Sequence, residues 1–513
     1  MSKTMITALA AALALGAGPA LAQKTLSIGM ATQDVQQLDP HRAVTTPERP
    51  LASWMFSGLV RFRPGSVSLE ALEPDLAEAW EISTDRLTWT FKIRRGVQFH
   101  KGMGELTADD VVYSIKRAGD AKTSAFSSDF AVIDSIEAID SHTVQIKLKN
   151  RVPFFLGSLV NYQGGFIVSK KAAEAAGENF KTNPIGTGPF AYQETKPNDR
   201  VTLVAHKQYF RGAPKLDTVH YRFIPSDATR DLAFEAGEIQ VIYGAQTQIW
   251  ADRMKRSPNT VVDVARPAEL SVLSLNTKSK PLDDKRVRLA VAHAVNRVEL
   301  AKAKGDIVAV PGVSVIPSGY LGTDEQAPLP AFDIAKAKQL LTEAGYPNGV
   351  TIKAIHTQLP GMLTTIQVVQ AQLKRAGIDL QIDLVDHATF HAQIRQDLSQ
   401  VIHYSSARFP VADIYLTQFF HSRSIIKTPT AVTNFSHCAV ADADIDAARN
   451  EADLAKQKQL WISAQRKIIE EVCGVALIEQ MQVWARKANV DYGYKLEGQI
   501  NLGPILTEAT TIN

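Results

Sequence analysis

The segment Leu-Thr-Trp-Thr-Phe-Lys-Ile-Arg-Arg-Gly-Val-Gln-Phe at residues 87–99 alternates apolar with polar side chains over most of its length. Successive side chains of a strand point to opposite faces, so Trp89, Phe91 and Ile93 would share one face. Residues 144–149, Val-Gln-Ile-Lys-Leu-Lys, repeat the alternation. Both segments are therefore predicted to be half-buried strands.

Helix signals separate these strands and continue toward the C-terminus. Residues 107–110, Thr-Ala-Asp-Asp, predict a helix start, because Thr107 can cap the helix and Asp110 stands at the capping-box position. The sequence further predicts a helix from Asp333 to Ala344 with a glycine cap at Gly345, helices at 363–376 and 455–471, and a strand at 378–384. Alternating helices and strands indicate an α/β fold with mixed sheets.

Length and composition limit the class of protein. A chain of 513 residues with 45% hydrophobic side chains predicts two or three domains with sizeable cores. The net charge of +3 and the absence of a long basic run argue against a nucleic-acid partner. No repeat or low-complexity linker is found, so we expect domains joined by strand-like crossovers and moving about a hinge.

The N-terminus has the pattern of a secretory signal peptide over residues 1–22. Lys3 is followed by an apolar run at 6–17 and by Ala20-Leu21-Ala22, a small-x-small site that predicts cleavage after Ala22. The alternative, a membrane anchor, is disfavoured because a span needs roughly 20 apolar residues. We expect a soluble exported protein without a lipid anchor, since Gln23 rather than a cysteine follows the site.

Export would place both cysteines, Cys438 and Cys473, in an oxidising compartment. A disulfide between them is one expectation, and two separate buried thiols are the other. Two cysteines are too few for a scaffold built on disulfides or for a cysteine-rich zinc site.

Motifs of catalysis are absent from the sequence: it has no G-x-S-x-G, H-E-x-x-H or G-x-x-x-x-G-K-[ST] motif. Gly186-Thr187-Gly188-Pro189 is predicted to be a tight turn that enters a strand, because Pro189 lacks the N–H that a phosphate loop would use. His387 and His391, four residues apart, would share a helix face suited to a metal, or be surface or internally bonded histidines.

Seven motifs together resemble the extracytoplasmic solute-binding proteins of ABC importers, of the peptide, nickel and opine class (solute-binding family 5). Examples are TADDVVYS at 107–114 and PIGTGPF at 184–190. A third block, DLAFEAGEI at 231–239, is followed by Gln240 where the family has an Asp. The remaining similar blocks are 73–80, 87–102, 281–290 and 333–346.

The resemblance implies a periplasmic binding protein-like α/β fold, with two lobes of mixed sheets joined by a hinge and an inserted third domain. A small solute would bind between domains I and III of a periplasmic, monomeric protein, which would deliver it to the permease of an ABC transporter without a cofactor or a catalytic step. The implied bounds are 23–55, 185–272 and 486–513 for discontinuous domain I, 56–184 for inserted domain II, and 273–485 for domain III.

The resemblance also exposes a change of charge at Arg408. Peptide-binding members carry an acidic residue that pairs with the ligand's ammonium group, and Arg408 stands at that position in the segment 405–413. Arginine suits a carboxylate or phosphate, which favours an anionic organic solute such as an opine or a sugar phosphate over a peptide-like ligand. The alternatives are that Asp413 or Asp386 takes the amine role, or that Arg408 forms a structural ion pair.

Further ligand-binding candidates come from the family's topology alone: Thr45, Thr46, Glu48, His356, Gln358, Asp386, His387, Ser405, Ser406 and Phe409. A nickel or metallophore receptor of the same class is the alternative function, because His387, His391 and His403 are available. A secreted hydrolase is a weaker alternative, since no nucleophile with a matching base stands out in the sequence.

Overall fold

The computed structural model describes residues 23–513 except 153, 162 and 428–432. The predicted signal peptide, residues 1–22, lies outside this range and stays a prediction. Within the described residues, no helix has the length and apolar character needed to cross a membrane.

A nine-stranded mixed sheet runs through the molecule, in the order β16-β12-β17-β11-β1-β10-β9-β8, with β13 on β17. Strand β1 pairs in parallel with β10 and β11, and the other pairs are antiparallel. This confirms the predicted mixed α/β class. The strands are β1 Thr25–Met30, β8 Phe190–Lys196, β9 Arg200–Ala205, β10 Thr218–Phe223, β11 Val241–Tyr243, β12 Thr260–Leu275, β13 Ala309–Pro311, β16 Val401–Ser406 and β17 Gly474–Lys487.

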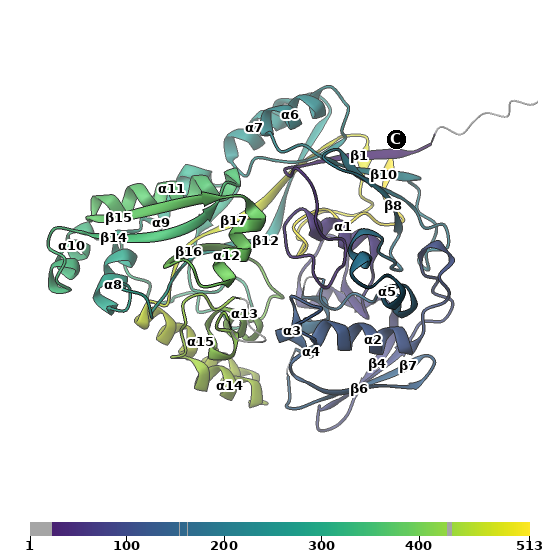
Figure 1. Cartoon of the computed structure of the whole chain (residues 1–513), viewed down its shortest axis with the longest axis horizontal. Helices are drawn as coiled ribbons and strands as arrows, with labels where there is room; N and C mark the ends of the chain where they lie inside the picture. Colours follow the sequence, from purple (N-terminus) through teal and green to yellow (C-terminus); the bar gives the residue numbers. More distant parts are fainter. Residues whose placement is uncertain (1–22, 153, 162, 428–432) are drawn as a thin grey trace, which may run out of the picture.

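The two longest strands, β12 and β17, connect the two sides of the molecule (Figure 1). The start of β12 pairs with the end of β17 beside β11, whereas the end of β12 pairs with the start of β17 beside β16. Their register shifts between Ala265 and Glu269 and again between Leu270 and Val272. The expected bounds of domains I and III, at 272 and 485, fall inside these strands, and the domain division itself stays a prediction.

A second, antiparallel sheet contains the segment that opened the sequence analysis, in the order β4-β5-β7-β6. Its strands are β4 Ala77–Ile82, β5 Thr88–Ile93, β6 Ile133–Asp140 and β7 Thr143–Leu148. Trp89, Phe91 and Ile93 are buried, as their alternation predicted. Strand β5 ends at Ile93 rather than at Phe99, because the chain turns at Gly96, whose φ is 73°.

Helix α2, Ala108–Gly119, packs on β6 and β7 and begins where the sequence predicted. The backbone N–H of Thr107 donates to Oδ2 of Asp110 at 3.0 Å, which is one half of the capping box. The remaining elements on this side are α1 Glu48–Met55, α3 Ser127–Phe130, α4 Phe155–Val160, α5 Lys170–Ala176, β2 Val60–Phe62, β3 Leu72–Pro74, β18 Val490–Asp491, β19 Thr511–Ile512, and the 3₁₀ turns Leu69–Ala71, His100–Gly102 and Gly177–Thr182.

The other side holds a parallel strand pair, β14 Val350–Thr357 and β15 Ile378–Val385, with helices packed around it (Figure 1). Asp333 caps α10 by accepting from the N–H of Lys336 at 2.8 Å, and Gly345 follows with a φ of 92°, as predicted. Near this pair lie α8 Lys285–Ala294, α9 Arg297–Lys304, α10 Ile334–Glu343, α11 Pro360–Arg375 and α12 His387–Arg395. Helices α13 Ala412–Phe420, α14 Asp442–Asn450 and α15 Leu454–Glu471 form a second group, with a 3₁₀ turn at Ser422–Ser424. Helix α6 Asp227–Glu235 packs instead on β1 and β11, and α7 Gln248–Arg256 packs on β12.

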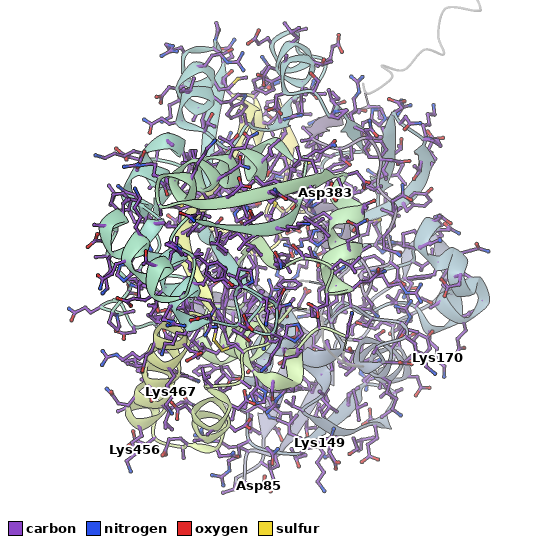
Figure 2. All side chains as sticks on the ribbon, turned by 60° about the vertical axis from the view of Figure 1, so that its left-hand side comes forward. Asp85, Lys149, Lys170, Asp383, Lys456 and Lys467 are labelled. Carbon is purple, nitrogen blue, oxygen red and sulfur yellow. A yellow bond between two sulfur atoms is a disulfide. The ribbon has the colours of Figure 1, made fainter. Side chains whose placement is uncertain are left out.

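A disulfide joins Cys438, in the loop before α14, to Cys473, which directly precedes β17. Of the two expectations for these cysteines, the structure therefore contains the bridge. Charged side chains of both signs, such as Asp85 and Lys456 of α15, are exposed at the periphery (Figure 2). This distribution accords with the small net charge.

Candidate functional site

A central cavity lies beside the middle of the β12–β17 pair. Its empty volume is about 860 Å³, counted with its opening to solvent. The walls come from segments that are distant in the sequence, including α1, α12, β11, β12, β16 and β17. The lining residues are Ala31, Val44, Thr46, Arg49, Asp227, Arg230, Tyr243, Gly244, Ala245, Gln246, Glu269, Leu359, Gly361, Met362, His387, His391, Tyr404, Ser405, Gln480, Met481 and Gln482.

The β12–β17 pair contributes a carboxylate and two amides to this cavity. Nε2 of Gln482 donates to Oε2 of Glu269 at 2.6 Å. Burial raises the pKa of Glu269, and the charges of Arg49 and Arg408 act in the opposite direction. Nε2 of Gln480 donates to Oγ of Ser271 at 3.0 Å. The irregular register near Glu269 therefore falls where polar side chains meet the cavity.

An adjoining cavity shares Val44, Arg49 and Tyr404 with the central one. Its empty volume is about 450 Å³. Its other lining residues are Ala125, Phe126, Asp129, Asn161, Arg395, Arg408, Gln418 and Thr433. Four arginines line the two cavities. Arg230 is held by Asp227 and by the backbone carbonyls of Tyr243 and Ile224, and the other three are Arg49, Arg395 and Arg408.

Arg408 lines the adjoining cavity rather than the central one. Its Nε donates to Oε1 of Gln418, and its Nη1 donates to the carbonyl of Ala407 at 2.7 Å. The guanidinium also lies over the ring of Phe419, 4.8 Å from the centroid. These contacts fix the side chain in a buried position.

Asp129 faces Arg408 through Gln418, whose Nε2 donates to Oδ1 of Asp129. Nδ2 of Asn161 donates to the other carboxylate oxygen at 2.9 Å. Burial raises the pKa of Asp129 to about 6, against the effect of the Asn161 hydrogen bond and of the charge on Arg408. The adjoining cavity thus contains a carboxylate that titrates close to neutral pH.

Arg395, on the last turn of α12, lines the adjoining cavity together with Arg49 and Arg408. Its Nε is shielded from solvent and has no hydrogen-bond partner within the described part of the chain. Burial lowers the pKa of Arg395, and the charge of Arg49 contributes to the lowering. A guanidinium in this position has free donors for an added acceptor.

Two histidines of α12, His387 and His391, line the central cavity with ring centroids 4.7 Å apart. Burial lowers the pKa of His387 to about 4 and that of His391 well below its usual value, with a contribution to both from the charge of Arg49. Both rings are therefore neutral at pH 7. In the described residues, no group of three or more His, Cys, Asp or Glu side chains is arranged to hold a metal ion.

The structure brings few of the predicted site residues into the cavities. Thr46, His387 and Ser405 line the central cavity, and Arg408 lines the adjoining one. Glu48 is buried, and its Oε2 accepts from the N–H groups of Val44 and Thr45, both at 3.1 Å. Glu48 and Thr45 thus shape the loop before Arg49 without lining a cavity.

The other predicted residues lie outside both cavities. Nε2 of His356 is 2.9 Å from Nδ1 of His403 in the core. Gln358 is exposed, and so is Asp386, which caps α12. Ser406 donates to the hydroxyl of Tyr415 at 3.1 Å, and the buried ring of Phe409 stacks on Phe62.

The two alternatives weighed for the amine role also lie off the cavities. Asp413 is buried in an ion pair, with its Oδ1 3.0 Å from Nε of Arg449. Asp386 accepts from the N–H groups of Ala388 and Thr389 at the start of α12. The other alternative, a structural ion pair of Arg408, stays a prediction; the charge of Arg408 acts to lower the pKa of Asp129 and of Glu269 against the effect of burial.

Sequence reasoning missed Arg49, Glu269, Arg395, Gln480 and Gln482. One signal was present in the residues 474–485, Gly-Val-Ala-Leu-Ile-Glu-Gln-Met-Gln-Val-Trp-Ala, where two glutamines interrupt an apolar run with a spacing of two. In a buried strand, amides at such positions must find polar partners. This pattern points to a polar site on β17.

Comparisons with a family model, a curated relative and solved structures all match this chain to solute-binding proteins. The family model described as bacterial extracellular solute-binding proteins, family 5 (middle), matches residues 71–426. A curated relative, the glutathione-binding protein GsiB of Salmonella choleraesuis (strain SC-B67), is 28% identical over 496 residues, which are 94% of each chain.

Two solved structures resemble the whole chain. The binding protein MoaA from A. tumefaciens R10, in complex with mannopinic acid, is 48% identical with a TM-score of 0.93, and the match covers 96% of this chain and 100% of MoaA. The periplasmic binding protein DppA from Helicobacter pylori, in complex with the peptide STSA, is 27% identical with a TM-score of 0.86, over 96% and 98% of the chains. The protein therefore belongs to family 5 of the bacterial extracellular solute-binding proteins, which are binding receptors of ABC importers and not enzymes.

Proposed function

We propose that this protein binds a small organic acid of the opine type across the central and adjoining cavities, and delivers it as a periplasmic monomer to the permease of an ABC importer. The observation that carries the proposal is the gathering of Arg49, Arg395 and Arg408 around the two joined cavities.

The charges of these arginines favour an anionic ligand. Positive charges close together in a partly dehydrated site repel one another. Burial is the main cause of the lowered pKa of Arg395, and the charge of Arg49 adds to it. A ligand carboxylate would relieve this repulsion and could accept two parallel hydrogen bonds from a guanidinium. Asp129 and Glu269 offset only part of this positive charge, because two carboxylates face three arginines.

The neutral polar side chains of the central cavity suit the rest of such a ligand. Gln246, Tyr404, Ser405, Gln480 and Gln482 offer amide and hydroxyl groups that match hydroxyls or amides. Mannopinic acid, bound by the similar protein MoaA, supplies a concrete candidate.

A peptide with a free ammonium group is the second candidate. Glu269 supports it, because its carboxylate lines the central cavity and could pair with an ammonium. GsiB and DppA, both less similar than MoaA, are associated with glutathione and a peptide. In this reading Glu269 takes the role that the sequence analysis assigned to an acid at position 408.

Isothermal titration calorimetry of the mature protein with mannopinic acid and with the peptide Ser-Thr-Ser-Ala tests the proposal. We expect mannopinic acid to bind more tightly, and Arg395→Met to weaken it by about 10- to 100-fold through the loss of a charged hydrogen bond. Arg375→Met is the matched control, because Arg375 is exposed on α11 and pairs with Glu299 at 3.4 Å. Tighter binding of the peptide, unaffected by Arg395→Met, would overturn the anion assignment.

A further inference from the structure

A chain of hydrogen bonds leads from the core to the wall of the central cavity. It begins at the carbonyl of Thr357, 2.8 Å from Nδ1 of His356, and continues from Nε2 of His356 to Nδ1 of His403 at 2.9 Å. Nε2 of His403 lies 3.3 Å from Oγ of Ser271, which in turn is 2.6 Å from Oγ of Ser405. Of the side chains in this chain of hydrogen bonds, Ser405 lines the central cavity.

The direction of each bond follows from its first acceptor. A carbonyl oxygen only accepts, so Nδ1 of His356 carries the proton. The Nε2 atom of a neutral ring is then an acceptor, and Nδ1 of His403 must donate to it. By the same reasoning Nε2 of His403 accepts, and the hydroxyl of Ser271 must donate its single proton to His403.

Ser271 then has no proton for Ser405. Its oxygen accepts from Nε2 of Gln480 at 3.0 Å and must also accept from the hydroxyl of Ser405. Ser271 thereby makes one donated and two accepted hydrogen bonds, the full capacity of a hydroxyl. Ser271, His356 and His403 are all fully buried, so water does not compete for these positions.

We infer that Ser405 presents only lone pairs to the central cavity and therefore selects a hydrogen-bond donor of the ligand, a hydroxyl or an N–H group, while disfavouring a carboxylate at that point. The inference deepens the proposed function and rests on it for the location of the ligand. It also orients an organic acid, because the acid group belongs with the arginines and the donor group with Ser405.

The imidazole rings of His356 and His403 are neutral, which supports the direction assigned to the hydrogen bonds. Burial lowers the pKa of His356 to about 4 and that of His403 well below its usual value. The charges of His356 and Lys304 would further disfavour a proton on His403. At neutral pH the chain therefore keeps a single direction.

The tautomers provide a test that needs no ligand. Long-range ¹H–¹⁵N correlation spectra of the histidine rings in the whole mature protein, assigned with His356→Gln and His403→Gln, should show both rings neutral with the proton on Nδ1. A proton on Nε2 of either ring would reverse the chain and overturn the inference.

Analogues of mannopinic acid test the consequence for binding. Replacing a ligand hydroxyl by fluorine removes a hydrogen-bond donor but keeps a weak acceptor. At the hydroxyl that contacts Ser405, the fluoro analogue should bind at least about 10-fold more weakly than mannopinic acid, and as weakly as the analogue that lacks this hydroxyl. Ser405→Ala should abolish the difference in affinity between mannopinic acid and this fluoro analogue. Ser406→Ala, on the opposite face of β16, should keep the difference.

The outcomes separate the inference from the proposed function. If mannopinic acid binds and depends on Arg395, but no fluorine substitution is sensitive to Ser405→Ala, the inference fails while the proposed function stands. If mannopinic acid does not bind, the proposed function fails for this acid, and the tautomers alone decide the direction of the chain.

Discussion

The backbone N–H of Gly186 donates a hydrogen bond to Nδ1 of His100 at 3.3 Å. The other ring nitrogen, Nε2, donates to the carbonyl of Gly188 at 2.9 Å. One neutral imidazole thus joins the segment 87–102 to the turn at 184–190, two of the motifs on which the family resemblance rested. Because one nitrogen accepts and the other donates, a second proton would break the Gly186 bond.

Acid should therefore weaken the fold through His100. Burial lowers the pKa of His100 to about 3, so between pH 6.5 and 3 the unfolded chain takes up a proton that the folded chain refuses. Its contribution to the free energy of unfolding is present above pH 6.5 and should fall by about 2 kcal/mol by pH 5. Other buried histidines add to the total loss, so urea unfolding at pH 7.5 and pH 5 isolates the contribution of His100 only by comparison with a variant that lacks it.

The variant His100→Gln should be less stable than wild type at pH 7.5 and should lose less stability on going to pH 5. His293→Gln, at a half-buried histidine of α8, is the control and should keep the wild-type dependence on pH. If His100→Gln lost as much free energy of unfolding between pH 7.5 and pH 5 as the wild type, the prediction that the buried ring of His100 opposes protonation would be wrong.

The glycine of the same turn should not tolerate a side chain. A Cβ at Gly186 would lie 2.2 Å from the carbonyl oxygen of Met55, at the end of α1. We expect Gly186→Ala to lower the free energy of unfolding by more than about 2 kcal/mol, because backbone must move to relieve the clash. Gly119→Ala is the matched control, since its Cβ would meet Phe130 at an ordinary 3.5 Å. Equal thermal stability of the two variants would contradict the close approach.

The disulfide should contribute measurably to stability. Cys438 and Cys473 are 35 residues apart in sequence, and a crosslink of that span is expected to add about 3 to 4 kcal/mol by restricting the unfolded chain. Reductant should lower the unfolding temperature of the wild type but leave Cys438→Ser/Cys473→Ser unchanged. A wild type that is equally stable with and without reductant, after mass spectrometry has verified reduction, would argue against this contribution.

Binding of an organic acid should strengthen as the pH falls through about 6. Burial raises the pKa of Asp129 to about 6, so its carboxylate is charged above that pH and repels an anion near Arg408. Below that pH the protonated side chain of Asp129 carries no charge and no longer repels the ligand's carboxylate. Calorimetry with mannopinic acid at pH 5 and 7.5 should show tighter binding at pH 5, with proton uptake on binding.

Asp129→Asn should flatten this dependence, because it removes the titrating group while keeping its shape. Asp383→Asn, at an exposed position of β15, should leave the dependence intact (Figure 2). Weaker binding at pH 5 in the wild type would place the anion away from Asp129.

Local features could be predicted from the sequence because their causes are local. The alternation around Trp89 and the caps at Thr107 and Asp333 depend on side chains a few residues apart, and all three were confirmed. The α/β class followed from the same signals.

The cavities could be predicted only in part, because they depend on contacts between distant segments. Arg49, Glu269 and Gln480 come from α1, β12 and β17 and meet only in the folded sheet. His356 was expected at the ligand because members of the family place ligand contacts at this strand end, yet it turns into the core toward His403. A side chain's direction at a strand end follows from the packing around it, which one sequence does not specify.

Glu269, Gln480 and Gln482 stand on the two strands that also link the two sides of the molecule. A rotation about such a link displaces each atom in proportion to its distance from it, so atoms at the cavity move least and atoms at the outer rims move most. A solute bound in the cavity would therefore restrict the rotation close to its axis. The position of the outer rims, where a permease would make contact, would then differ most between the empty and the filled protein.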